Sequence, residues 1–143
     1  MARAGKTRRY RNEVAALCLS LQGYFRRSER YARDAGLTAT EYDLILAVSA
    51  LPQNSAPNIA LLCDRLLAYH HVGSTTVARL VKKDLLTSER NPSDMRSVVL
   101  RLTVKGRELL RNITFRSIAN LRERGPDMLD SLESVLGGAD SQF

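Results

Sequence analysis

The sequence has few of the residues that build cross-linked or metal-dependent proteins. Its 143 residues include two cysteines and two histidines. Cys18 and Cys63 lie far apart, and one distant pair does not make a disulfide scaffold. The sequence has no Cys/His cluster, and the adjacent His70 and His71 do not share one helix face. We therefore expect no disulfide framework, no metal site and no cofactor.

Catalytic and membrane-spanning motifs are also missing. The sequence has no glycine-rich phosphate-binding loop, no nucleophile motif and no cluster of carboxylates. No apolar run approaches the roughly 20 residues needed to span a bilayer. The apolar stretch after Arg8 and Arg9 starts with Glu13, is short and leads into charged residues, unlike an export signal. These absences predict a cytoplasmic protein that is not an enzyme.

Negative charge is scarce as well. The chain has 15 acidic and 22 basic residues, a net charge of +7 and a pI near 9.9. Such a balance favours a polyanionic partner, either nucleic acid or an anionic membrane surface. Residues 1–12 contain no acidic residue and five basic ones, Arg3, Lys6, Arg8, Arg9 and Arg11. This segment is either a frayed tail or a basic arm for DNA phosphates or a partner subunit.

What is present suits one folded domain with long helices at both ends. The hydrophobic content of 44% is enough for an ordinary core. From about Tyr10 to Ala35 one apolar stripe at helical spacing is formed by Val14, Leu17, Cys18, Leu21 and Phe25. Gly36 would end this helix, and its apolar surplus suggests packing between subunits. Near the other end, a helix from Val104 to about Arg124 would break at Gly125-Pro126, and a last helix would reach about Leu136.

A second helix has a clear start. Thr38 and Glu41 form a Thr-x-x-Glu capping box, in which each side chain satisfies the other residue's backbone N–H. Leu37 and Tyr42 stand where a hydrophobic staple would close the same end. The helix would end by Pro52.

Two further helices are expected before the hairpin. Pro57 suits the first turn of a third helix. A fourth helix would run to about Asp84. It would start either near His70 or at Ser74, which could serve as a local cap.

A β-hairpin follows the fourth helix. Leu85–Arg90 reads as a strand, residues 91–97 as a polar turn, and the alternating run Val98–Thr103 as the return strand. Helix, hairpin and helix in this order predict a mainly α winged helix-turn-helix. In that fold one helix enters the DNA major groove, and the hairpin tip contacts the backbone or minor groove.

Four stretches are specific in combination: Leu37-Thr38-x-x-Glu41-Tyr42, Arg79–Leu86, Asn91–Ser97, and Leu102-Thr103-x-Lys105-Gly106-Arg107. From about residue 10 to 136, their order and spacing resemble the MarR family of bacterial winged helix-turn-helix transcription regulators. The resemblance implies a homodimer whose terminal helices interlock. It also implies a palindromic DNA operator, and repression that a small phenolic or anionic effector relieves. The cell would be bacterial or archaeal.

The resemblance also implies a domain order and exposes two departures. Residues 1–36 would be a basic arm and dimerisation helix, 37–103 the DNA-binding domain, and 104–143 the C-terminal dimerisation helices and tail. Asp84 stands where the family usually has glycine, although aspartate tolerates a positive φ better than most residues. Met95 stands where the family often has arginine, which removes one cation from the wing.

The residues expected to contact DNA lie on the fourth helix and the wing: His70, His71, Val72, Ser74, Thr75, Arg79, Arg90, Ser93 and Arg96. Ser74 and Thr75 are either base or phosphate contacts or helix caps. Arg79 is either a contact or part of a solvated face. Asp94 would pair with Arg96 and stabilise the wing.

The implied effector site and two alternatives complete the expectations. The residues expected to line the site, unless each is plain packing, are Tyr24, Arg27, Tyr31 and Tyr42. Cys18 raises redox sensing as an alternative to inert packing. However, the cysteine and tyrosine of the family's peroxide sensors align with Val14 and Ala39, so that site is not matched. The other alternative is a non-specific architectural or membrane-surface protein.

Overall fold

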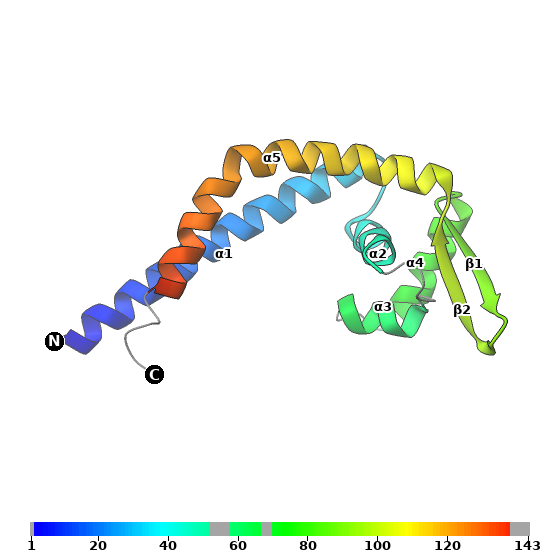
Figure 1. Cartoon of the computed structure of the whole chain (residues 1–143), viewed down its shortest axis with the longest axis horizontal. Helices are drawn as coiled ribbons and strands as arrows, with labels where there is room; N and C mark the ends of the chain where they lie inside the picture. The colour runs from blue at the N-terminus through cyan, green and yellow to red at the C-terminus, as the bar shows by residue number, and fades with distance from the viewer. Residues whose placement is uncertain (1, 52–57, 67–69, 138–143) are drawn as a thin grey trace. The chain divides into compact units, whose positions relative to one another are not determined.

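The computed structural model describes residues 2–51, 58–66 and 70–137 (Figure 1). Side chains are defined in these ranges except at residues 2–4, 6, 65–66 and 70–71. The elements of the described ranges are α1 (Ala2–Asp34), α2 (Ala39–Ser49), α3 (Ile59–Leu66), α4 (His70–Lys82), β1 (Leu86–Asn91), β2 (Asp94–Leu102) and α5 (Val104–Gly137). They form two compact units, one of Tyr31–Thr114 and one of Met1–Arg30 with Phe115–Phe143.

The unit Tyr31–Thr114 has a single hydrophobic core. Its most deeply buried apolar side chains come from α2, α3, α4, both strands and the start of α5: Leu44, Ile45, Leu62, Leu80, Leu86, Leu100 and Ile113. Three helices followed by an antiparallel hairpin make up a winged helix, so the predicted fold class is confirmed. None of the described helices combines the length and the apolarity that crossing a membrane requires.

The start of α2 follows the predicted capping box. The backbone N–H of Glu41 donates to Thr38 Oγ1 at 3.2 Å, and that of Thr38 donates to Glu41 Oε2 at 2.8 Å. Leu37 and Tyr42 are both buried in the core, as a hydrophobic staple requires. Tyr42 is therefore a core residue of the winged helix.

The start of α3 is set by a residue that the sequence reasoning passed over. Asn58 Oδ1 accepts the backbone N–H of Leu61 at 2.8 Å, which is the bond of an N-cap. The predicted helix start at Pro57 lies outside the described residues.

Helix α4 begins at His70, the earlier of its two predicted starts. Ser74 and Thr75 thus lie inside the helix, and a capping role for them is wrong. Gly73 packs against α3, because a β-carbon at this position would collide with Cys63 Sγ. This close approach fixes the spacing of the two helices.

Two helices end in the same left-handed turn. Gly36 has φ 84°, and the N–H of Leu37 donates to Ala32 O at 2.9 Å. Asp84 has φ 58°, and the N–H of Leu85 donates to Leu80 O at 2.9 Å. These are Schellman endings, which satisfy the last carbonyls of α1 and α4. The positive φ considered for Asp84 is confirmed.

The hairpin is longer and tighter than predicted. Leu86 pairs with Leu102 and Arg90 with Val98, and the register then shifts so that Asn91 pairs with Asp94. The return strand β2 therefore begins at Asp94, where the sequence predicted a seven-residue turn to Ser97. Asp94, Arg96 and Ser97 are polar, so this stretch lacks a regular apolar alternation. An exposed hairpin tip packs against no core that would require one.

The other unit consists of most of α1 and the end of α5. α1 starts at Ala2, so the predicted helix start near Tyr10 is wrong. The helix contradicts a frayed tail, whereas the alternative of a basic arm stays a prediction. α5 continues through Pro126, so the predicted break at Gly125-Pro126 is also wrong. A proline removes one backbone hydrogen bond and bends a helix without necessarily ending it, and the orange stretch of α5 bends in Figure 1.

Candidate nucleic-acid interface

One face of α4 is available to DNA. Val72, Thr75 and Arg79 are three or four residues apart and at least partly exposed, so they share a face. Val77 and Leu80 are buried on the opposite side. Three other residues of α4 were predicted to contact DNA. Ser74 is half-buried, and the side chains of His70 and His71 lie outside the described part.

The wing tip is shaped by hydrogen bonds to its own backbone. Asn91 Oδ1 accepts the N–H of Ser93 at 3.0 Å. Asp94 Oδ1 accepts the backbone N–H of Arg96 at 3.0 Å, and Asp94 O accepts the hydroxyl of Ser97 at 3.1 Å. Asp94 thus contacts Arg96 through its backbone N–H. No ion pair between their side chains is found among the described residues.

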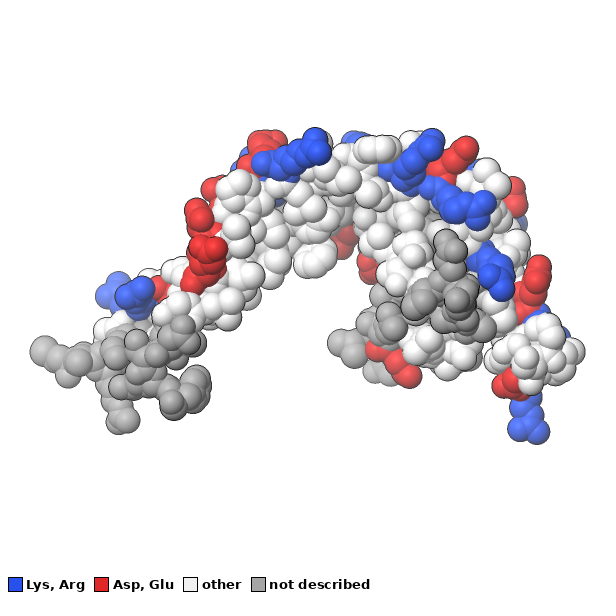
Figure 2. Space-filling model, in the orientation of Figure 1, with Lys and Arg blue, Asp and Glu red and all other residues white. Residues whose placement is uncertain are grey.

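The basic side chains of the wing differ in how firmly they are held. Arg90 Nη1 donates to Met95 O at 3.2 Å, which folds this side chain along the tip. Arg96 and Ser93 are exposed, and Met95 is 59% exposed. Figure 2 shows a basic side chain projecting at the hairpin tip. The predicted wing contacts therefore lie together on an accessible surface.

The Leu-Thr-x-Lys-Gly stretch, residues 102–106, contacts the base of the hairpin. Thr103 Oγ1 donates to Asp84 O at 2.8 Å and accepts the N–H of Gly106 at 2.9 Å. A β-carbon at Gly106 would collide with Leu85 O. Arg107 Nη1 donates to the carbonyl of the last residue of β2 at 2.8 Å. This motif therefore joins the hairpin to α5, and its residues serve structure.

An ion pair between a buried carboxylate and an exposed lysine, which the sequence reasoning missed, lies beside this contact between the hairpin and α5. Glu41 is 1% exposed, and its Oε2 lies 2.7 Å from Lys83 Nζ. Burial raises the pKa of Glu41, but the hydrogen bonds from Lys83 and Thr38 and the charges of Lys83 and Arg79 outweigh it. The pKa therefore lies below its usual value. The partners are 42 residues apart, so no local pattern signals the pair.

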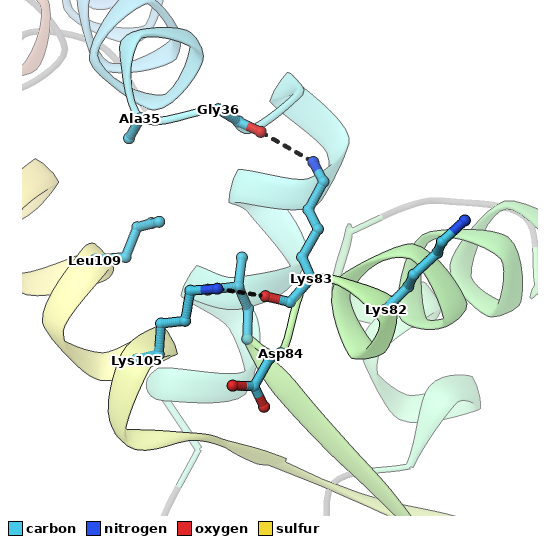
Figure 3. A pocket seen from close by; sticks show the side chains of 8 residues that line it. Ala35, Gly36, Lys82, Lys83, Asp84, Lys105 and Leu109 are labelled. Atoms are coloured by element: carbon cyan, nitrogen blue, oxygen red, sulfur yellow. Dashed lines mark hydrogen bonds between the residues drawn. The ribbon is translucent and has the colours of Figure 1, made fainter.

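A shallow cavity of about 360 Å³ lies next to this pair (Figure 3). Lys83, Lys105 and Asp84 stand around it, with Ala35, Leu85 and Leu109 as apolar lining. Lys105 Nζ donates to Lys83 O at 3.0 Å, and Lys83 Nζ donates to Gly36 O. The two ammonium groups therefore provide hydrogen bonds to carbonyls just after helix ends.

The residues predicted for an effector site divide between the two units. Tyr24 and Arg27 belong to the unit of the chain ends, and both are half-buried. Tyr24 packs edge-on against Phe25, with ring centroids 5.6 Å apart. Tyr31 and Tyr42 belong to the winged-helix unit, where Tyr31 packs against the core.

The cysteines lie in different environments. Cys18 is exposed on α1, whereas Cys63 is buried under Gly73. Both are free thiols. Across the described residues, no group of three or more potential metal ligands is found.

Comparison with known proteins connects this geometry to a family. The model of the MarR family matches residues 35–97, from the end of α1 to the wing. The winged-helix segment of this chain is thus similar to the MarR family. Comparison with curated protein sequences gives no match.

Solved structures share this MarR-type fold beyond the matched segment. One MarR family transcription regulator superposes with a TM-score of 0.73 at 20% identity, over 85% of this chain and 79% of its own. AbsC, a MarR family transcriptional regulator from Streptomyces coelicolor, gives 0.67 at 20% identity, over 83% of each chain. A cysteine-to-serine mutant of MarR from E. coli complexed with operator DNA gives 0.64 at 20% identity, over 83% and 86%.

Proposed function

We propose that the chain is a homodimeric, sequence-specific DNA-binding transcription regulator. Its α4 face and its wing would make the contacts to DNA. The observation that carries this proposal is the joint exposure of a helix face with Val72, Thr75 and Arg79 and of a wing with Arg90 and Arg96. The net charge of +7 adds non-specific attraction to phosphates.

The two exposed surfaces have distinct roles in this proposal. α4 enters the major groove, where Val72 meets a thymine methyl and Thr75 reaches a base edge or phosphate. The wing follows the backbone into the minor groove, where Arg90 and Arg96 are favoured by the negative potential. Contacts by His70, His71, Ser74 and Ser93 remain part of the proposal.

Dimerisation through the terminal helices is supported by the exposed apolar residues of their unit. The large apolar side chains that are exposed in this unit include Val14, Leu19, Phe25, Phe115, Leu129, Leu132 and Leu136. So many large apolar groups on one small unit indicate a protein interface. A second copy of the chain places two winged helices on a palindromic site, because the symmetry of such an operator matches a two-fold dimer.

Repression relieved by a small phenolic or anionic effector is the regulatory part of the proposal. Arg27 Nε, Ser28 Oγ, Ser117 Oγ and Asn120 Oδ1 are buried without a hydrogen-bond partner in the described structure. Buried polar atoms are normally paired, so a ligand or water would complete them. Release of operator DNA by phenolic acids, compared between wild type and Arg27→Met, tests this part. Equal release from both would exclude Arg27.

The decisive experiment is selection of bound fragments from the source genome. A palindrome enriched over random DNA by about 10³ or more supports the proposal. Selectivity of only a few-fold supports an architectural protein that binds DNA through charge alone.

Redox sensing is favoured by one observation, the exposure of Cys18. Mass spectrometry after mild peroxide, with operator binding measured alongside, tests it. Unmodified Cys18 with unchanged binding excludes this function, and modified Cys18 with lost binding supports it.

A further inference from the structure

The C-terminal end of α4 is held by one side chain. Lys83 Nζ donates to Gly36 O at 2.9 Å and to Glu41 Oε2 at 2.7 Å. The same Glu41 oxygen accepts the N–H of Thr38, so it is fixed in the first turn of α2. Lys83 therefore ties the recognition helix to the end of α1 and to the start of α2.

The backbone of Lys83 is held as well. Its N–H donates to Arg79 O at 3.0 Å and closes the last turn of α4. Its carbonyl accepts Lys105 Nζ, from the first turn of α5, at 3.0 Å (Figure 3). The next residue, Asp84, accepts the hydroxyl of Thr103. Contacts from the segment after α1, from the start of α2 and from the start of α5 thus meet at Lys83, just after α4, and all of them lie within the unit Tyr31–Thr114.

These hydrogen bonds restrict the orientation of α4, which the apolar core alone does not restrict. Val77 and Leu80 hold α4 in the core through apolar contacts, which depend little on angle. Hydrogen bonds weaken steeply as their geometry departs from the optimum. The contacts of Lys83 therefore select one orientation of α4 among those that the core tolerates.

The distance along α4 amplifies that selection. Lys83 lies eleven residues after Val72, which is about 16 Å at about 1.5 Å per residue. A tilt of about 5° around Lys83 therefore moves Val72 by about 1.4 Å, more than the roughly 0.5 Å tolerance of a well-built site.

We propose that Lys83 is a positioning residue for DNA recognition, which sets the orientation of α4 and thereby the half-site spacing that a dimer accepts. The inference rests on the proposed function. Lys83 itself contacts protein, and its effect on DNA passes through Glu41 and Gly36.

The test compares Lys83→Met with Lys82→Met in selections from palindromes of varied half-site spacing. Lys82 is the neighbouring exposed residue, its side chain points away from the bond to Gly36 in Figure 3, and that side chain has no hydrogen bond within the described ranges. Both variants lose one charge. We expect Lys82→Met to keep the wild-type spacing, and Lys83→Met to bind that spacing at least about tenfold more weakly and to select a broader range. Lys83→Arg, which keeps a donor, should restore the preference.

Each outcome separates the inference from the proposed function. A wild type that selects no palindrome overturns both. A wild type with a defined spacing, together with Lys83→Met that matches Lys82→Met in spacing and affinity, overturns the inference alone. If Lys83→Met does not fold by circular dichroism, Glu41→Met replaces it, because methionine removes the oxygen that accepts Lys83 Nζ. Unchanged spacing in that variant also overturns the inference, whereas broadened spacing supports it.

Discussion

Gly73 of α4 lies directly against Cys63 Sγ of α3, and no β-carbon fits between them. Ile59 Cγ2 would also lie 3.3 Å from such a carbon. Gly73→Ala should therefore force α3 and α4 apart and lower the free energy of unfolding by about 1–3 kcal/mol. Urea denaturation followed by circular dichroism measures this change.

Gly5 provides the matched control, because a β-carbon there meets nothing within 4 Å inside helix α1. Gly5→Ala should raise the free energy of unfolding by up to about 0.5–1 kcal/mol, since alanine loses less entropy in a helix. Adding Cys63→Ala to Gly73→Ala should recover part of the loss. Similar changes at Gly73 and Gly5 would contradict the packing argument.

Arg90 is expected to contribute to DNA affinity in a sequence-independent way. Arg90→Ala should weaken binding to all DNA sequences and lower the salt dependence by about one ion. Arg101→Ala removes the same charge opposite Thr87, near the hairpin base, and should have a smaller effect. Fluorescence anisotropy across a salt series measures both. Unchanged affinity of Arg90→Ala at low salt would show that the wing does not contact DNA.

Glu41 should make stability depend on acid pH. Its pKa in the folded protein is below the usual value, so its contribution is complete above the unfolded pKa of about 4.3. The contribution is lost as pH falls through the lower folded pKa. Glu41→Gln keeps a capping group without the charge and should be less stable near neutral pH by about 1 kcal/mol. The gap between wild type and variant should close below about pH 4. A gap that stays constant down to pH 2 would argue against the ion pair.

Asp84 occupies a backbone conformation that favours glycine, with φ 58°. The left-handed conformation costs a non-glycine residue about 1–2 kcal/mol, and glycine avoids this cost. Glycine loses more backbone entropy on folding, which offsets part of that advantage. Asp84→Gly should therefore raise the free energy of unfolding by about 0.5–1 kcal/mol, whereas Asp84→Ala should lower it. Thermal unfolding of the two variants decides the matter. A loss of stability in Asp84→Gly would mean that the carboxylate has a role of its own.

Local signals predicted the parts of the fold that local bonds determine. The capping box of Thr38 and Glu41 and the helix end at Gly36 each involve residues within a few positions of each other. A sequence pattern can therefore contain them whole. The order of helices and strands followed from the same signals, because hydrophobic periodicity marks each element.

Long-range contacts explain what the sequence did not predict. Lys83 reads as one more surface lysine until folding brings Glu41 beside it. Pro126 reads as a helix end, yet α5 passes through it. The polar start of β2 at Asp94 lacks alternation, because only its pairing with Asn91 defines it as a strand. The effector residues stay predictions for a related reason, since a binding site depends on how side chains converge.

The bond between Arg90 and Met95 holds the wing tip without using the side chain of residue 95. Arg90 donates to the backbone carbonyl at position 95, a group that every amino acid provides. Position 95 can therefore change from methionine to a cationic, polar or aromatic residue while this bond and the turn around it persist. Wing libraries randomised at position 95 should yield many proteins with altered operator preference, whereas libraries randomised at position 90 should yield folded proteins that mostly bind DNA more weakly.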